Sequence, residues 1–140
     1  MKEEESYDVE PERFGELVQE ALRDLPPPFA ARLQNVQVVT EERPSRKTLR
    51  QMGLSGRGDD TLLGLYQGTS LMDRTSDYGN VLPDRIILYR EPVLDEAYAT
   101  QQDDETFEDA VRAVVRDTVL HEVGHHFGMR EEDLDDLGYG

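Results

Sequence analysis

The stretch VLHEVGHHFGMRE, residues 119–131, holds all three histidines of this 140-residue chain. Within it, His121, Glu122 and His125 form the pattern H-E-x-x-H. On a helix, residues four apart lie on one face, so the imidazoles of His121 and His125 are placed to grip one metal ion. Glu122 lies about 100° round the helix, beside the metal without being forced to ligate it. Two neutral nitrogen ligands and a carboxylate base are the arrangement that a zinc hydrolase needs.

A third protein ligand is expected, because a catalytic zinc site usually takes three ligands from the protein and one from water. The chain has no cysteine and no fourth histidine, so a carboxylate remains. The longer pattern H-E-x-x-H-x-x-G-x-x-ligand places Gly128 where the chain turns back and Glu131 at the ligand position. The spacing favours Glu131 as ligand. The acidic residues that follow remain alternatives: Glu132, Asp133, Asp135 and Asp136.

Three further polar residues near the motif have two interpretations each. His126 neighbours Glu122 around the helix, where it contacts substrate or serves as a structural histidine. Asp117 lies one turn before His121 and is a candidate to orient its ring, although a solvated charge is the favoured interpretation. Tyr139 is a candidate oxyanion donor on its position alone.

Composition limits the class of protein. The formal net charge of −16 comes from 31 acidic and 15 basic residues, which disfavours nucleic acid and anionic membranes as partners. Without cysteine, disulfides and thiolate metal sites are excluded. No signal peptide and no membrane span is expected, so we predict a cytoplasmic protein, monomeric by default. Residues 1–9 are predicted to be a flexible acidic N-terminus, and residues 10–140 a single domain.

Apolar spacing predicts two main helices. Residues 11–25 carry a helical stripe that begins at a proline and ends before three more. A long helix is expected from about residues 103–105 to 127. In this long helix, Phe107, Val111 and Val114 lie on the same side as His121. The metal-facing edge is therefore expected to continue the edge that faces the core.

Three strands are predicted from runs of β-branched and apolar residues, namely 36–40, 61–67 and 85–90. The second and third are expected to pair antiparallel, and a proline at position 92 stops the third. Residues 29–33 are predicted to form a short helical turn. Residues 41–60 read as an irregular connection, and their basic residues as a solvated loop in preference to an anion site.

Three segments together resemble the small bacterial zincin-like metallopeptidases, often described as minimal zincins. They are HEVGHHFGM followed by an acidic residue, LLGLYQG and LPDRIILYR. The resemblance runs roughly from Phe14 to Leu137. It implies an α/β (α+β) fold: a small mixed sheet of three to four strands with an N-terminal helix and a long active-site helix. The methionine turn of true metzincins is missing, because no methionine follows Met129.

The resemblance also implies a metzincin-like site, with one zinc ion per chain held by His121, His125 and Glu131 and with Glu122 as base. The leading hypothesis is a zinc-dependent metallopeptidase acting on a peptide or protein substrate. The alternative is a non-catalytic, metal-stabilised binding or regulatory protein of the same fold. An acidic mimic of nucleic acid is disfavoured, because the charge is spread over termini and loops.

Overall fold

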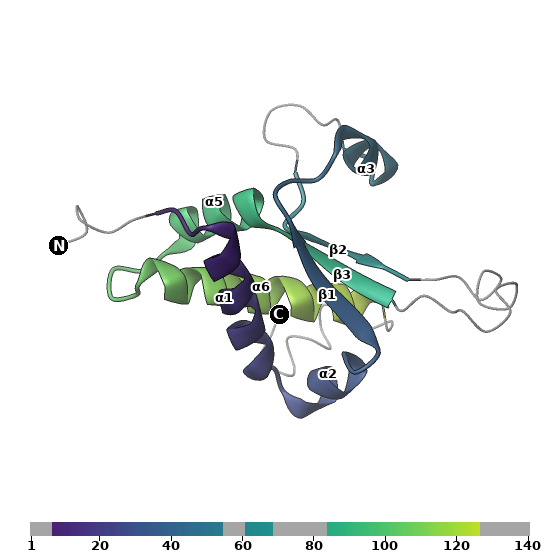
Figure 1. The fold of residues 1–140 in the computed structure, drawn as a ribbon, viewed down its shortest axis with the longest axis horizontal. Coiled ribbons are helices and arrows are strands. Elements are labelled where there is room, and N and C mark those ends of the chain that lie inside the picture. Colours follow the sequence, from purple (N-terminus) through teal and green to yellow (C-terminus); the bar gives the residue numbers. More distant parts are fainter. Residues whose placement is uncertain (1–6, 55–60, 69–83, 127–140) are drawn as a thin grey trace, which may run out of the picture.

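In the computed structural model of the protein, residues 7–54, 61–68 and 84–126 are described. They form a mixed α+β fold, which confirms the predicted class (Figure 1). The elements in chain order are α1 (Pro11–Arg23), α2 (Pro27–Arg32), β1 (Val36–Glu41), α3 (Arg46–Gln51), β2 (Gly64–Gln67), β3 (Asp84–Tyr89), α5 (Arg90–Thr100) and α6 (Phe107–His126).

The sheet is mixed, with strand order β1-β3-β2 in the described residues. β1 runs parallel to β3, with Val38 opposite Ile86. β2 runs antiparallel to β3, with Gly64 opposite Leu88, which confirms the predicted pairing. The predicted strand 61–67 starts three residues too early. β3 is the central strand, and the buried run from Ile86 to Tyr89 reflects cover on both of its faces.

Helix α1 confirms its predicted stripe. Phe14, Leu17, Val18 and Ala21 are all buried, and a proline occupies the first turn. The prolines after α1 end that helix, but Pro27 also begins α2, because a first-turn residue has no intrahelical partner for its N–H. The predicted turn at residues 29–33 is thus a helix that starts two residues earlier.

The sequence analysis did not predict two of the helices in the described residues, α3 and α5. Residues 41–60 were predicted to be irregular, yet Ser45 caps α3 by accepting a hydrogen bond from the Thr48 amide at 3.1 Å. Only Leu49 is buried in α3, so no apolar period marks it. Helix α5 follows β3 directly, and its buried residues include Val93, Leu94 and Ala97.

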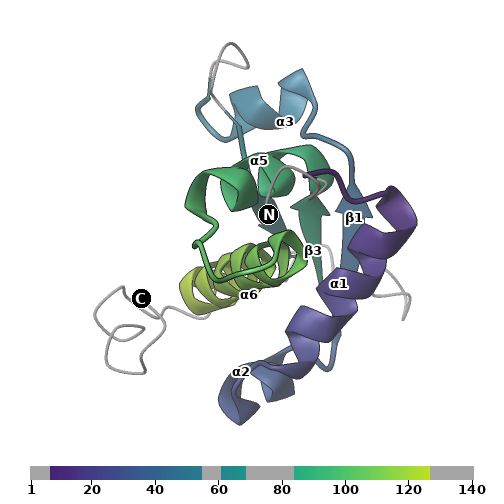
Figure 2. The ribbon, with the colours of Figure 1, turned by 90° about the vertical axis from the view of Figure 1, so that its left-hand side faces the viewer.

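Helix α6 packs against one face of the sheet, with α1 alongside it (Figures 1 and 2). Its start is fixed by Thr106, whose hydroxyl accepts a hydrogen bond from the Asp109 amide at 3.1 Å. The main core lies between α1, α6 and one face of the sheet. On the other face, Leu65, Ile87 and Tyr89 form a smaller cluster. None of the helices in the described ranges is long and apolar enough to cross a membrane.

Ion pairs fix α6 against α1. The Arg13 guanidinium donates two hydrogen bonds to the Glu108 carboxylate, at 3.1 and 2.8 Å. Arg112 donates to Glu20 at 2.8 Å. These contacts tie the first half of α6 to the rest of the fold. The second half carries the H-E-x-x-H motif.

At the chain start, Val9 is buried, and its carbonyl accepts a hydrogen bond from Arg90 at 2.7 Å. Tyr7 stacks edge-on against Tyr98 and Phe107. The packed part of the chain therefore begins by residue 7. The rest of the predicted flexible N-terminus, residues 1–6, lies outside the described residues.

Candidate metal and catalytic site

His121 and His125 lie one turn apart on α6, as the motif predicts. Their ring centres are 6.2 Å apart, and the ring planes are inclined at 36°. With zinc–nitrogen distances of about 2.0–2.1 Å, two imidazoles that share one ion have centres about 6.5 Å apart at most and about 5 Å apart at a tetrahedral angle. The pair is therefore within reach of a common ion, and a closure of about 1 Å would give the tetrahedral angle.

The tautomer of His121 is set by its own helix. Nδ1 of His121 lies 2.9 Å from the carbonyl oxygen of Asp117. A carbonyl only accepts hydrogen bonds, so Nδ1 carries the proton and the lone pair lies on Nε2, the nitrogen that a metal would take. The favoured interpretation of the Asp117 carboxylate, a solvated charge, agrees with its exposed position 3.8 Å from Arg116. The group that orients the His121 ring is the backbone oxygen of Asp117.

The histidines lie at the rim of the core. His121 is half-buried and His125 is exposed, whereas Val119, Leu120 and Val123 on the other side of the same turns are buried. The sequence predicted that the side of α6 that carries His121 continues the side that faces the core. Phe107, Val111 and Val114 are buried as expected, but this buried side ends before His121. The core side shifts around the helix along its length, which leaves the imidazoles accessible.

Glu122 is held by the neighbouring strand. Its Oε1 accepts a hydrogen bond from the backbone N–H of Tyr66 in β2 at 2.8 Å. The Tyr89 amide donates to the Leu63 carbonyl, so by the antiparallel alternation Leu65 faces β3 and the Tyr66 amide points away from it. Glu122 therefore caps the outer edge of β2. The sequence analysis missed this contact, which joins residues 56 positions apart.

Gly64 allows β2 to approach α6 closely. A Cβ atom at this position would lie 2.8 Å from Cγ2 of Thr118 and 3.1 Å from the carbonyl oxygen of Ile87. Any larger residue would therefore push β2 and α6 apart. Because Tyr66 lies two residues further along β2, Gly64 also determines how near the Tyr66 amide comes to Glu122.

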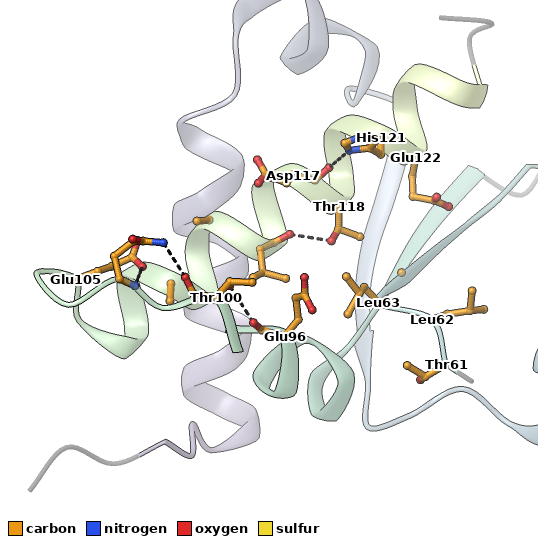
Figure 3. Close-up of a pocket in the computed structure, with 15 residues that line it drawn as sticks. Thr61, Leu62, Leu63, Glu96, Thr100, Glu105, Asp117, Thr118, His121 and Glu122 are labelled. Carbon is orange, nitrogen blue, oxygen red and sulfur yellow. Dashed lines mark hydrogen bonds between the residues drawn. The ribbon is translucent and has the colours of Figure 1, made fainter. Parts of the chain in front are cut away.

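A cleft of about 630 Å³ adjoins the motif, between α6, α5 and the segment leading into β2 (Figure 3). His121 and Glu122 are part of its wall. The remaining lining residues are Thr61, Leu62, Leu63, Gly64, Glu96, Thr100, Gln102, Glu105, Ala110, Ala113, Val114, Asp117 and Thr118. The cleft therefore places His121 and Glu122 beside a volume within the usual range of ligand pockets, about 300–1,000 Å³.

The predicted third ligand belongs to the stretch that follows α6 in the sequence. Glu131, its acidic alternatives, Gly128 and Tyr139 lie outside the described residues, and the side chain of His126 is not described. Among the described residues, no group of three histidine, aspartate or glutamate side chains is arranged to hold a metal. The described donor set, two imidazoles one turn apart with one tautomer fixed, fits two of three protein ligands of a zinc ion. The acidic stretch after His126 remains the expected source of the third.

Similarity to known proteins extends over most of the chain. The profile of a family described as zincin-like metallopeptidases matches residues 33–140, more than half of the chain. A solved structure of a conserved hypothetical protein from Thermo thermophilus is 27% identical. That alignment covers 90% of this chain and 97% of the other, with a TM-score of 0.48. No curated protein matches.

Proposed function

We propose that this chain, which belongs to the zincin-like metallopeptidase family, is a zinc-dependent peptidase. The observation that carries the proposal is the arrangement of His121, Glu122 and His125 on α6, with His121 and Glu122 in the wall of the cleft. Family membership supports hydrolase chemistry in general terms. The placement of an accessible imidazole pair and a carboxylate beside a ligand-sized cleft supports peptide hydrolysis by this chain itself.

His121 and His125 would hold the metal through one nitrogen each, and Glu131 is the proposed third ligand. Zinc bound there would polarise the substrate carbonyl and lower the pKa of a water towards neutrality. The hydrogen bond from His121 Nδ1 to the Asp117 carbonyl orients the ring and leaves Nε2 as the nitrogen that would ligate the metal.

Glu122 is the proposed general base. Its carboxylate accepts the proton of the attacking water and returns it to the leaving amine when the peptide bond breaks. The Tyr66 amide fixes one carboxylate oxygen of Glu122 at 2.8 Å, so β2 sets the orientation of the base. This support matters because proton transfer requires hydrogen-bond distances between the base and the water.

The proposed substrate is a peptide or a protein segment in extended form. β2 lies at the edge of the described sheet, and its outer edge runs past Glu122. A peptide that pairs with this edge on either side of the Tyr66 amide, which Glu122 occupies, would make main-chain hydrogen bonds and would carry its backbone across the base. Side chains on one face of the peptide would then enter the cleft next to α6.

The second candidate function is a metal-stabilised binding protein without turnover. The hydrogen bond between Glu122 and Tyr66 favours it, since that contact also gives the carboxylate a structural role that joins α6 to β2. In this case the histidines would hold a structural metal, and the cleft would bind a partner that is not cleaved.

Glu122→Gln separates the two functions. Glutamine keeps an oxygen that accepts from the Tyr66 amide but cannot take a proton, so we expect folding and metal content to persist and turnover to be lost. The measurement is cleavage of a broad peptide library by zinc-loaded protein, with and without a chelator. Asp95→Asn is the matched control, because Asp95 is exposed and is not part of the cleft wall. Full cleavage by Glu122→Gln would contradict the proposed mechanism.

A further inference from the structure

The cleft extends away from the histidines along α6, towards the end where α5 finishes. Its wall contains His121 and Glu122 at one end and Thr100, Gln102 and Glu105 at the other. A side chain entering beside Glu122 would therefore point along the helix and not into solvent. A volume of about 630 Å³ accommodates the longest side chains.

The middle of the cleft is apolar. Leu62 and Leu63 approach from the segment before β2, and Ala110, Ala113 and Val114 contribute from α6. These small and aliphatic residues leave space for a chain of methylene groups and bury it favourably.

The side chains that line the cleft carry a net negative charge. Apart from Glu122, the lining includes the carboxylates of Glu96, Glu105 and Asp117, and it includes no lysine or arginine among the described residues. Such a cleft, with low-dielectric walls, attracts cations and repels anions.

Glu96 is the carboxylate best placed to meet a ligand. Its side chain extends from α5 into the space between α6 and Leu63 (Figure 3). Within the described parts of the chain, its carboxylate makes no hydrogen bond or ion pair. By contrast, an oxygen of Glu105 already accepts from the Gln102 amide at 3.1 Å.

We propose that this cleft is a specificity subsite that takes a long cationic side chain, lysine or arginine, of the substrate, with Glu96 as the specificity-determining residue. The inference rests on the proposed peptidase function. Lysine and arginine carry an aliphatic stem that suits the apolar walls and a cationic head that suits Glu96. Glutamate in the same place would face three carboxylates, and norleucine would fill the stem region without the charge contact.

The first test compares peptides that differ in one side chain. A neutral, extended peptide carries lysine, norleucine or glutamate at each position in turn, and kcat/KM is measured with zinc-loaded full-length protein. At one position we expect lysine to exceed norleucine about two- to fivefold, a modest factor because Glu96 is exposed. Glu96→Gln should remove this preference by lowering kcat/KM for the lysine peptide to about the value for the norleucine peptide.

Asp95→Asn is the matched control. Asp95 neighbours Glu96 on α5, is exposed, and is not part of the cleft wall, so the change in net charge is the same. We expect this variant to keep the lysine preference. If both variants lose the lysine preference equally, the preference comes from the overall charge of the protein, and the assignment of Glu96 is overturned. Cleavage with no lysine preference at any position would overturn the subsite.

A binding measurement keeps the inference testable if no peptide is cleaved. The same labelled peptides are titrated into zinc-loaded Glu122→Gln protein and its Glu96→Gln double variant, with fluorescence anisotropy as readout. Tighter binding of the lysine peptide that depends on Glu96, without cleavage by wild type, would support the subsite and contradict the peptidase. Equal binding of lysine and norleucine peptides in both proteins would contradict the subsite.

Discussion

The two halves of α6 are held in different ways. Both halves bury one side in the core, through Phe107 and Val111 in the first and Leu120 and Val123 in the second. On the polar side, the first half is tied to α1 by ion pairs that Arg13 and Arg112 make with glutamates. The second half carries the histidines at an accessible rim and contacts β2 through Glu122.

This difference separates stability from chemistry along one helix. Ion pairs and core packing fix the position of the first half, so that the second half can expose imidazoles without unfolding. The well-packed first half of α6 stabilises a site whose own side chains are not optimised for packing. Variants in the two halves should therefore affect different properties.

The largest contrast in stability is expected between Phe107→Ala and His125→Ala. Phe107 is 2% exposed, and its truncation should lower the free energy of unfolding by about 3–5 kcal/mol. His125 is exposed, and its truncation should change that free energy by about 0.5 kcal/mol or less in metal-free protein. Denaturant unfolding in the presence of a chelator measures both. Similar losses in the free energy of unfolding for the two variants would contradict the proposed difference between the two halves of the helix.

A smaller effect is expected where α6 meets β2. Gly64→Ala should lower the free energy of unfolding by about 1–3 kcal/mol, because the new methyl group would meet Cγ2 of Thr118. Thr118→Ser removes Cγ2, so the double variant should lose less than the sum of the two single losses. A double-mutant cycle measures this coupling. Strictly additive losses would show that the Gly64–Thr118 contact does not set the approach of the strand.

The smallest effect concerns the ion pair between the helices. The Arg13 guanidinium, by its hydrogen bonds, holds the pKa of Glu108 below its ordinary value of 4.5. A carboxyl group with a lowered pKa stabilises the fold above its unfolded-state pKa, and this stabilisation is lost as the pH falls through the folded-state value. The Glu108 side chain is 42% exposed, so solvent screening limits the contribution to about 0.2–1 kcal/mol.

Glu108→Gln checks this contribution. The variant should be less stable than wild type near pH 7, and the two should converge at a pH below the folded-state pKa of Glu108. High salt should also reduce the difference at neutral pH. Denaturant unfolding at both pH values provides the measurement, with Asp95→Asn as the exposed control. A constant difference at all pH values would point to packing of the side chain and not to its charge.

Elements with a long apolar period could be predicted from the sequence. Helix α1 and most of α6 follow from their apolar period, because burial of one face imposes it. Strand β3, covered on both faces, follows from a continuous apolar run. Helix α3 has one buried residue, Leu49, and depends on the Ser45 cap, so no period was available. Helix α5 begins directly after β3, where the proline at position 92 was interpreted only as a stop.

The same limit applies to the site. His121, Glu122 and His125 are close in sequence, and helix geometry alone places them together. The Tyr66 amide and the Glu96 carboxylate come from other elements, and their approach to α6 depends on strand register and on the unpredicted α5. A glycine within a strand is typical of close backbone approach, but the sequence analysis gave Gly64 no such role, and its partner Thr118 is visible only in the fold.

The most direct test of the central claim is the metal content of the full-length protein, purified without a metal-affinity step and compared with His121→Ala and Glu131→Ala. We predict about one zinc ion per chain in wild type, loss of zinc in His121→Ala, and weaker retention in Glu131→Ala. Denaturant unfolding in chelator would verify that all three proteins are folded. Absence of metal from folded wild-type protein, even after zinc is added, would contradict the metal site and with it the proposed peptidase.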